Sequence, residues 1–250
     1  MSGFASLSMA SALKVASLNL CTDEYLLMLA RPGEIASVTR LSQDRSESPL
    51  WWKAQTYPAN RGAVEQVISV RPTLLLTMGG GARSRGLLAR RMGIRTIDLP
   101  YPASIADVAG NMRRVAAALG DARRAEPWLA RLKALEVATP KRQRDAIYVS
   151  GGGTSLSAGS PGAEWMALAG LKQRRLPGGR AEFETLLVAP PAVLVRSDYR
   201  RGQMSQGMRW FDHPVVKRLG PRTLATDGRA WTCGGPLMLD AIERLRRLVR

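Results

Sequence analysis

The sequence predicts an α/β protein with two similar Rossmann-like lobes, each built on a central, mainly parallel sheet. Short apolar runs alternate with helical segments of about ten residues, a pattern that is typical of parallel sheets covered by helices. A helix–proline–strand phrase also occurs twice, as AVEQVISVRPTLLL at 63–76 and as EFETLLVAPPAVLV at 182–195. The repeat indicates two lobes rather than one large sheet.

In the first lobe, apolar patterning predicts four strands, at 14–20, 34–39, 73–78 and 94–99. Helices are predicted at 24–30, 63–70, 84–92 and 105–119, with a polar turn at 21–23. The helix at 63–70 is expected to stop before Pro72, because proline disfavours a helical conformation in the residue that precedes it. Residues 41–62 are predicted to form a long loop, a kind of segment that is usually functional or disordered.

One long helix over 122–138 is predicted to join the lobes, kinked at Pro127 unless it starts there. The predicted domains are therefore a first lobe at 13–120, a bridging helix at 121–139 and a second lobe at 140–250. In the second lobe we expect strands at 146–150, 192–195 and 223–225, helices at 164–169, 182–189 and 237–248, and turns at 151–157 and 231–236.

The composition limits the chemistry. The formal charge is +17, and the basic excess is greatest after residue 140, which suggests an anionic ligand, an acidic partner or nucleic acid. One His and two Cys are too few for a typical zinc site, so no metal site is expected. His213 is expected to be a loop or helix-start residue rather than a catalytic base. No apolar run is long enough to span a membrane.

Four stretches together resemble a family: SLNLCTDEYLLMLA, the repeated phrase, GGGTSLSAGSPGAEWMALAGL and RAWTCGGP. They are similar to periplasmic substrate-binding proteins that serve ABC importers of iron-siderophore complexes and cobalamin. The resemblance covers about residues 13–248. It implies two α/β lobes bridged by one long helix, a ligand cleft between them and little hinge motion. It also implies a monomer without enzymatic activity or a cofactor.

The same resemblance implies a periplasmic location. The N-terminal MSGFASLSM has no Lys or Arg and only a short apolar core, so an export signal is incomplete or missing in this sequence. We therefore expect residues 1–12 to lie outside the fold.

A glutamate recurs in the repeated phrase, as Glu65 and as Glu184. In the family that this sequence resembles, these positions face the importer and pair with arginines of the permease dimer. One carboxylate on each lobe suits a transporter mouth of roughly two-fold symmetry. The alternative is that each glutamate, early in a helix, favours the helix dipole.

Ligands of such folds meet the loops at the carboxyl ends of the strands. The candidate ligand-binding residues follow predicted strands or lie in the long loop, and offer aromatic faces, guanidinium groups and small polar groups. In the first lobe they are Asn19, Cys21, Thr22, Asp23, Trp51, Trp52, Asn60, Arg61, Gly80, Gly81 and Arg83. In the second lobe they are Thr154, Ser155, Tyr199, Arg200, Trp231 and Thr232.

A ferric siderophore is the preferred ligand, because the second lobe is rich in arginine, and cobalamin is the next choice. Haem is less favoured, although Tyr199 would suit an axial ligand, and bare zinc or manganese is disfavoured because the chain has one His. Cys21 and Cys233 are either inert buried thiols or a disulfide that ties the lobes together.

Two other classes of protein remain as alternatives. TLLLTMGGG, followed by a helix, a strand and Asp98, resembles a dinucleotide-binding unit of a Rossmann-type enzyme. However, Ser84 stands where the third glycine of that motif belongs, and the unit begins in mid-lobe. A nucleic-acid binder would explain the charge, but no recognition helix is evident and no nucleic-acid partner is expected.

Overall fold

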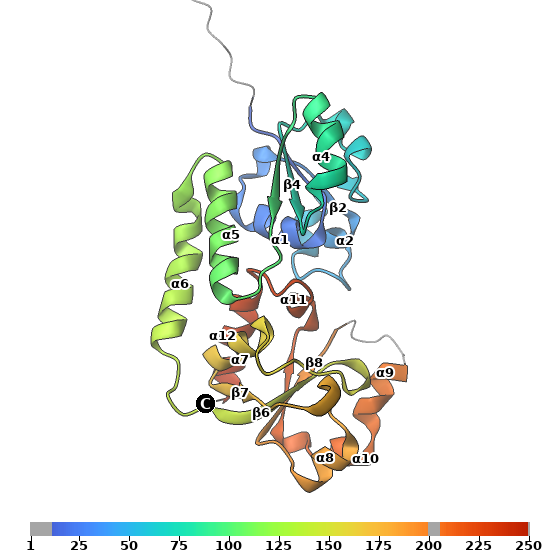
Figure 1. Cartoon of the computed structure of the whole chain (residues 1–250), viewed down its shortest axis with the longest axis vertical. Coiled ribbons are helices and arrows are strands. Elements are labelled where there is room, and N and C mark those ends of the chain that lie inside the picture. The colour runs from blue at the N-terminus through green and yellow to red at the C-terminus, as the bar shows by residue number, and fades with distance from the viewer. Residues whose placement is uncertain (1–11, 200–205, 250) are drawn as a thin grey trace, which may run out of the picture.

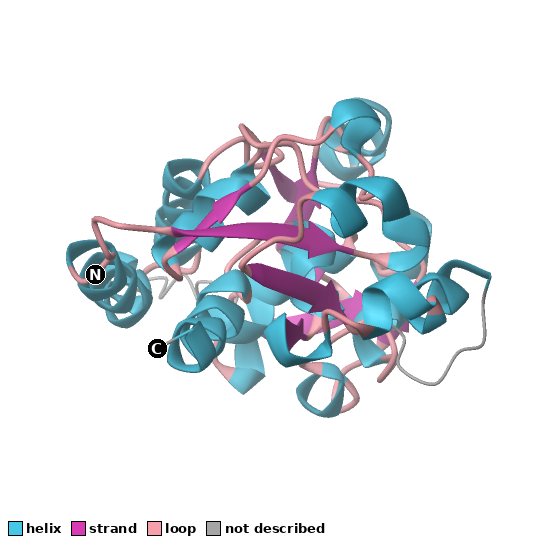
Figure 2. Cartoon of the chain, turned by 90° about the horizontal axis from the view of Figure 1, so that it is seen from below, coloured by secondary structure: helices cyan, strands magenta, loops and turns pink. Residues whose placement is uncertain are grey.

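The protein is described by a computed structural model, which covers residues 12–199 and 206–249, apart from the side chains of 82–85 and 221. Two lobes lie one above the other, and helices α5 and α6 run along one side of the molecule (Figure 1). Seen from below, helices flank the strands (Figure 2).

Each lobe contains one parallel sheet. The first has the order β3-β2-β1-β4-β5 and consists of β1 (Val15–Ser17), β2 (Ile35–Thr39), β3 (Ala59–Asn60), β4 (Leu74–Met78) and β5 (Arg95–Leu99). The second has the order β7-β6-β8-β9 and consists of β6 (Arg144–Val149), β7 (Leu171–Gln173), β8 (Val193–Ser197) and β9 (Thr223–Thr226). The predicted fold class is confirmed.

The helices that pack on the sheets or connect the strands include several very short ones. The α-helices are α1 (Leu20–Leu29), α2 (Arg40–Gln43), α3 (Trp51–Ala54), α4 (Ala82–Arg91), α5 (Ile105–Ala118), α6 (Glu126–Val137), α7 (Pro161–Leu168), α8 (Phe183–Val188), α9 (Gln206–Arg209), α10 (Pro214–Lys217), α11 (Gly228–Cys233) and α12 (Met238–Val249). The 3-10 helices are η1 (Pro32–Glu34), η2 (Val64–Gln66), η3 (Ile68–Val70), η4 (Ala122–Ala125), η5 (Gly151–Gly153), η6 (Pro177–Gly179), η7 (Trp210–Asp212) and η8 (Gly220–Arg222).

The repeated phrase occupies equivalent places in the two lobes. β4 and β8 begin within the last three residues of the two copies, and each pairs with the first strand of its lobe, β1 or β6. The helical parts differ, because 183–188 is an α-helix whereas 64–70 forms two 3-10 turns. The predicted helix at 63–70 is therefore wrong in type. Four of its residues are β-branched, which disfavours an α-helix. Arg71 ends the segment in a left-handed conformation with a φ of 46°.

Two predicted turns are instead helical. Residues 21–23 lie inside α1, which begins at Leu20 because Asn19 caps it, and 231–233 lie inside α11, which Asp227 caps. The predicted long loop at 41–62 also contains α3 and the edge strand β3.

The predicted bridging helix consists of η4 followed by α6. Pro127 lies in the first turn of α6, where its missing N–H costs nothing, so it starts the helix rather than kinking it. With 12 residues, α6 spans about 18 Å. The domain limits at residues 120 and 140 stay a prediction.

One hydrophobic cluster runs through both lobes. It contains Tyr25 and Leu74 of the first lobe and Val193 of the second, joined through buried side chains that include Trp128 and Trp165. Because protein interiors are closely packed, a shared core of this kind opposes rotation of one lobe against the other. Little hinge motion between the lobes stays a prediction.

Candidate ligand-binding site

Several candidate residues at the ends of β1 and β3 have structural roles. Asn19 Oδ1 accepts a hydrogen bond from the Cys21 amide at 2.8 Å and so caps α1. Thr22 is fully buried, and its hydroxyl donates to the Asn19 carbonyl at 2.9 Å. Asn60 is 2% exposed and donates through Nδ2 to the carbonyl oxygens of Ser17 and Val38, each at 2.9 Å. Thr22 and Asn60 were predicted to face a ligand. Both are instead buried, and they hold the strand ends in place.

Asp23 is also fully buried. Its carboxylate accepts hydrogen bonds from the amide of Thr39 at 3.1 Å and from the Thr39 hydroxyl at 2.5 Å. Burial raises its pKa to about 7, although these hydrogen bonds favour the charged form. The predicted ligand role of Asp23 is therefore replaced by a structural one, which is to tie α1 to the end of β2.

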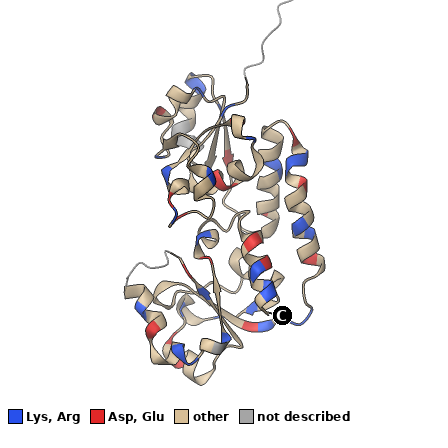
Figure 3. Ribbon diagram, turned by 180° about the vertical axis from the view of Figure 1, so that it is seen from behind, with Lys and Arg blue, Asp and Glu red and all other residues tan. Residues whose placement is uncertain are grey.

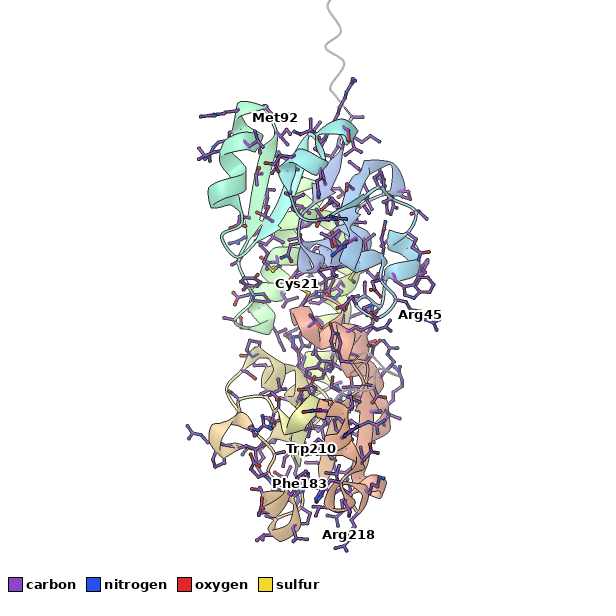
Figure 4. The ribbon with its side chains drawn as sticks, turned by 90° about the vertical axis from the view of Figure 1, so that its right-hand side faces the viewer. Cys21, Arg45, Met92, Phe183, Trp210 and Arg218 are labelled. Atoms are coloured by element: carbon purple, nitrogen blue, oxygen red, sulfur yellow. A yellow bond between two sulfur atoms is a disulfide. The ribbon has the colours of Figure 1, made fainter. Side chains whose placement is uncertain are left out.

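Cys21 and Cys233 form a disulfide between the lobes, with a Cα–Cα distance of 5.3 Å. Of the two predicted alternatives, the structure shows the paired one. The bond links the first turn of α1, which follows β1, to the end of α11, which follows β9. Cys21 lies at the boundary between the lobes (Figure 4). The disulfide thus holds together the carboxyl-end sides of the two sheets.

A second set of contacts joins the loop after α2 to the second lobe. The Tyr199 hydroxyl donates to Glu47 Oε2 at 2.5 Å. Arg229 Nη1 donates to the carbonyl oxygens of Arg45 at 2.7 Å and Ser48 at 3.3 Å. Arg229 is itself paired with Asp227, with an Nη2–Oδ2 distance of 2.6 Å. The segments that follow β8 and β9 therefore meet the first lobe here.

Sequence reasoning found Tyr199 but missed Glu47, Ser48, Asp227 and Arg229. Asp227 carried a local signal, because an aspartate before a helical segment is a common N-cap. The other three carried none, because their partners lie on the opposite lobe and are distant in sequence.

The aromatic candidates differ in exposure. Trp52 is 62% exposed, and Trp51 is half-buried with the Arg45 guanidinium carbon 5.8 Å from its ring centroid. Arg45 lies on the side of the first lobe that faces the second (Figure 4). Trp231 packs against Tyr148 with ring centroids 4.4 Å apart, and its indole N–H donates to Thr226 Oγ1 at 3.0 Å. Of these three tryptophans, Trp52 is therefore the most exposed.

The remaining candidates divide into surface and structural positions. Those on the surface are Arg61, Gly80, Thr154 and Thr232, with Gly81 half-exposed. Ser155 Oγ donates to the Tyr148 carbonyl at 2.6 Å, which gives it a structural role. The Arg83 side chain and Arg200 lie outside the described residues.

Asp98 closes the glycine turn after β4. It accepts hydrogen bonds from the Gly80 amide at 2.7 Å and from the Thr77 hydroxyl at 2.6 Å. The Tyr101 ring packs on Gly79, where a Cβ atom would stand 2.0 Å from Tyr101 Cε2. The predicted alternative used Asp98 to hold a ribose and the glycines to admit a pyrophosphate. Both features instead serve the turn, so the dinucleotide-binding alternative is not supported.

His213 caps α10, with Nδ1 accepting from the Val215 amide at 3.3 Å, so the predicted helix-start role is confirmed. Its ring stacks on Phe183, which in turn stacks on Trp210 in the second lobe (Figure 4). Among the residues that the structure describes, no group of three His, Cys, Asp or Glu could hold a metal ion. No helix in the described chain has the length and apolar character needed to cross a membrane.

A separate cavity of about 400 Å³ lies in the second lobe between β8, β9 and α10. Its charged lining residues are paired: Arg196 Nε lies 2.8 Å from Asp198 Oδ1, and Lys217 Nζ lies 3.7 Å from Asp212 Oδ1. The charged side chains that line this cavity are therefore already engaged with neighbouring side chains of opposite charge.

We expect Gly228→Ala to disturb the lobe interface. A Cβ atom at Gly228 would lie 2.3 Å from Ser197 Oγ and 2.7 Å from the Tyr199 amide nitrogen. The added methyl group should push α11 from the end of β8, with a loss of about 1–3 kcal/mol in the free energy of unfolding, measured by chemical denaturation. Gly220→Ala is the control, because nothing lies within 4 Å of its Cβ position. Equal effects of the two substitutions would contradict this packing.

The structure has two α/β lobes, each with one parallel sheet, and the loops at the carboxyl ends of the strands meet across the lobe boundary. This is the fold of periplasmic binding proteins. The haem-binding protein HutB of Vibrio cholerae is 15% identical, with a TM-score of 0.73 over 96% of this chain and 99% of that one. The vitamin B12-binding protein BtuF of Vibrio cholerae is 18% identical, with a TM-score of 0.63 over 94% and 95%.

The siderophore-binding protein BauB, bound to acinetobactin and ferric iron, is 17% identical, with a TM-score of 0.71 over 95% of this chain and 92% of that one. No family model matches the sequence, and no curated protein matches it. The predicted resemblance to binding proteins of ABC importers is confirmed in the fold.

Proposed function

We propose that this chain is the solute-binding component of an ABC importer, located in the periplasm. In this proposal it captures a metal chelate between its lobes and delivers it as a monomer to a permease dimer, without enzymatic activity. One observation supports the proposal most. The segments that follow β1 and β2 in the first lobe contact the segments that follow β8 and β9 in the second. In open α/β sheets, ligands bind beside the carboxyl ends of the strands.

A ferric siderophore is the ligand that we propose first, and cobalamin second. Arg45 and Arg61 are exposed on the first lobe, and neither is in an ion pair with another described residue. Guanidinium groups suit the anionic oxygens of a chelate, and bidentate geometry is available to them. Trp51, beside Arg45, and the exposed Trp52 offer faces for the flat apolar parts of the chelate.

Haem is a third candidate ligand, and one specific contact favours it. The Tyr199 phenol is half-buried at the lobe boundary, and its hydroxyl is held by the Glu47 carboxylate. A tyrosine oxygen is one of the axial ligands that proteins use for haem iron. A carboxylate at hydrogen-bond distance would accept the phenol proton when the oxygen binds ferric iron.

The test is a titration of tryptophan fluorescence against ferric hydroxamate, catecholate and citrate chelates, cobalamin, haem, NAD and a short DNA duplex. We expect saturable quenching by one metal chelate or tetrapyrrole, at micromolar concentration or below, which persists at raised salt. If haem is the ligand, Tyr199→Phe should change its absorption spectrum. A response to NAD alone, or to DNA alone and only at low salt, would overturn the proposal.

We propose that Glu65 and Glu184 dock the protein on the permease. Both are exposed, and neither is in an ion pair with another described residue. Changing both to Ala should leave ligand affinity unchanged but lower uptake into permease proteoliposomes by about tenfold or more, because charged pairs at an interface govern register and association rate. The matched control changes the exposed Glu126 and Glu136, on α6, to Ala. Loss of ligand binding in the Glu65/Glu184 variant would contradict the docking role.

A further inference from the structure

Five exposed cations gather where the second sheet begins. They are Lys141, Arg142, Arg144, Lys172 and Arg247, and they are named the basic face below. The proposed transport function uses only a few arginines, such as Arg45 and Arg61. It therefore does not account for most of the positive charge of the chain. The basic face is therefore a feature that the proposed function leaves unexplained.

Hydrogen bonds fix the elements of the basic face next to one another. The Arg144 amide donates to the Gly170 carbonyl at 2.9 Å, and Arg144 Nη1 donates to the Val249 carbonyl at 3.1 Å. The buried Arg246 donates to the Leu135 carbonyl at 3.0 Å. The start of β6, the approach to β7 and the ends of α6 and α12 thus form one surface. Lys and Arg positions are seen near the C-terminal end of α12 and the neighbouring loop (Figure 3).

The charge of this surface is largely uncompensated. Lys141, Arg142, Lys172 and Arg247 form no ion pair with any described residue. The nearby acidic side chains are already engaged: Asp145 pairs with Arg174, and Glu136 lies 3.9 Å from Lys133. Arg247 in the last turn of α12 also complements the helix dipole, but Lys141, Arg142 and Lys172 lie outside helices.

Exposed aliphatic side chains belong to the same helix ends. Val137, the last residue of α6, is 76% exposed, and Leu248, near the end of α12, is 57% exposed. Cations combined with protruding aliphatic groups are the composition by which peripheral proteins bind the interface of anionic bilayers. We propose that the basic face binds a membrane surface that contains anionic phospholipid headgroups.

A nucleic acid fits this surface less well than a bilayer does. Single strands are bound through aromatic side chains on which bases stack, and duplexes through an element that enters a groove. The exposed large apolar residues on the helix ends beside the basic face, Val137 and Leu248, are aliphatic, so they offer bases no aromatic ring to stack on and would not favour binding to a phosphate backbone. The inference goes beyond the proposed function, because none of these residues belongs to the lobe contacts around Tyr199 and Arg229.

The test is co-sedimentation of the whole protein with phosphatidylcholine vesicles that do or do not contain about a third of phosphatidylglycerol. We expect binding only to the anionic vesicles, and loss of it at about 0.5 M salt. Changing Lys141, Arg142, Lys172 and Arg247 to Glu should weaken the partitioning at least about tenfold. Changing Val137 and Leu248 to Ser should weaken it by a smaller factor.

The matched control changes four exposed arginines elsewhere to Glu, and so makes the same change in net charge. They are Arg90 and Arg91 of α4 and Arg113 and Arg114 of α5. It should retain more vesicle binding than the basic-face variant. If the Glu variant melts early, the corresponding Gln variant replaces it. No binding of the wild type to anionic vesicles, equal losses in both variants, or tighter binding to a DNA duplex through the same residues would each overturn the proposal. Ligand titration of the basic-face variant should remain unchanged.

Discussion

Replacing Cys21 and Cys233 together with Ser is expected to lower the free energy of unfolding by about 3–5 kcal/mol. The two cysteines are 212 residues apart in sequence, so their disulfide closes most of the chain into one loop. A closed loop of this length strongly restricts the unfolded chain, and removing the bond restores its conformational entropy. The measurement is the midpoint and slope of denaturant unfolding.

Reduced wild-type protein serves as the control, because it lacks the same bond without any change of sequence. It should unfold at nearly the same denaturant concentration as the double Ser variant. If the reduced and the oxidised wild-type protein have the same midpoint of denaturant unfolding, the disulfide does not stabilise the fold. The variant should also bind ligand more weakly, since α11 is then held to α1 only by noncovalent contacts.

Stability is expected to fall as the pH rises from about 4 to 8, because Asp23 and Glu24 are buried side by side in α1. Burial raises the pKa of Asp23 from 3.8 to about 7. Burial, with the adjacent Asp23 charge, also raises the pKa of Glu24 well above its usual value. Stability from a raised carboxyl pKa is complete below the unfolded-state pKa and is lost as the pH rises through the folded-state pKa. For Asp23 this amounts to about 4 kcal/mol.

Glu24→Gln tests the source of this pH dependence. Glu24 Oε2 has no hydrogen-bond partner among the described residues, and the backbone hydrogen bond at Leu237 does not offset the burial of the carboxylate, so a neutral amide should be better tolerated there. We expect the variant to be more stable than the wild type at pH 8 and to lose less stability between pH 5 and pH 8. The exposed Glu126→Gln should change neither quantity. An unchanged pH profile in Glu24→Gln would show that this carboxyl group does not contribute.

Strong periodicity and proline positions allowed most of the fold to be predicted from sequence. The strand β4 and its counterpart β8 were found because each is an apolar run after a proline. β7 was missed because three residues, LKQ, carry little pattern. The apolar spacing of 63–70 suits an α-helix as well as it suits 3-10 turns, so spacing alone does not separate the two, and the β-branched residues of the segment are the only sequence signal against an α-helix.

The position of the candidate site at the lobe boundary stays a prediction, but the structure shows which of its residues lie there. Strand ends and the long loop pointed to the lobe boundary, where Tyr199, Cys21 and Trp51 lie. Asn60 was placed there for the same reason, yet it turned inward, because its amide is needed by three strand-end oxygens. Glu47 and Arg229 could not be predicted, since their roles depend on how the lobes pack.

Hydrogen exchange with and without the chelate or tetrapyrrole that quenches tryptophan fluorescence would show directly where the solute binds. If it lies between the lobes, the amides of 44–52 and those of 227–233 should both exchange more slowly in its presence, because these segments meet there. Protection of one lobe only, or protection confined to the cavity beside Arg196 and Lys217, would contradict binding between the lobes.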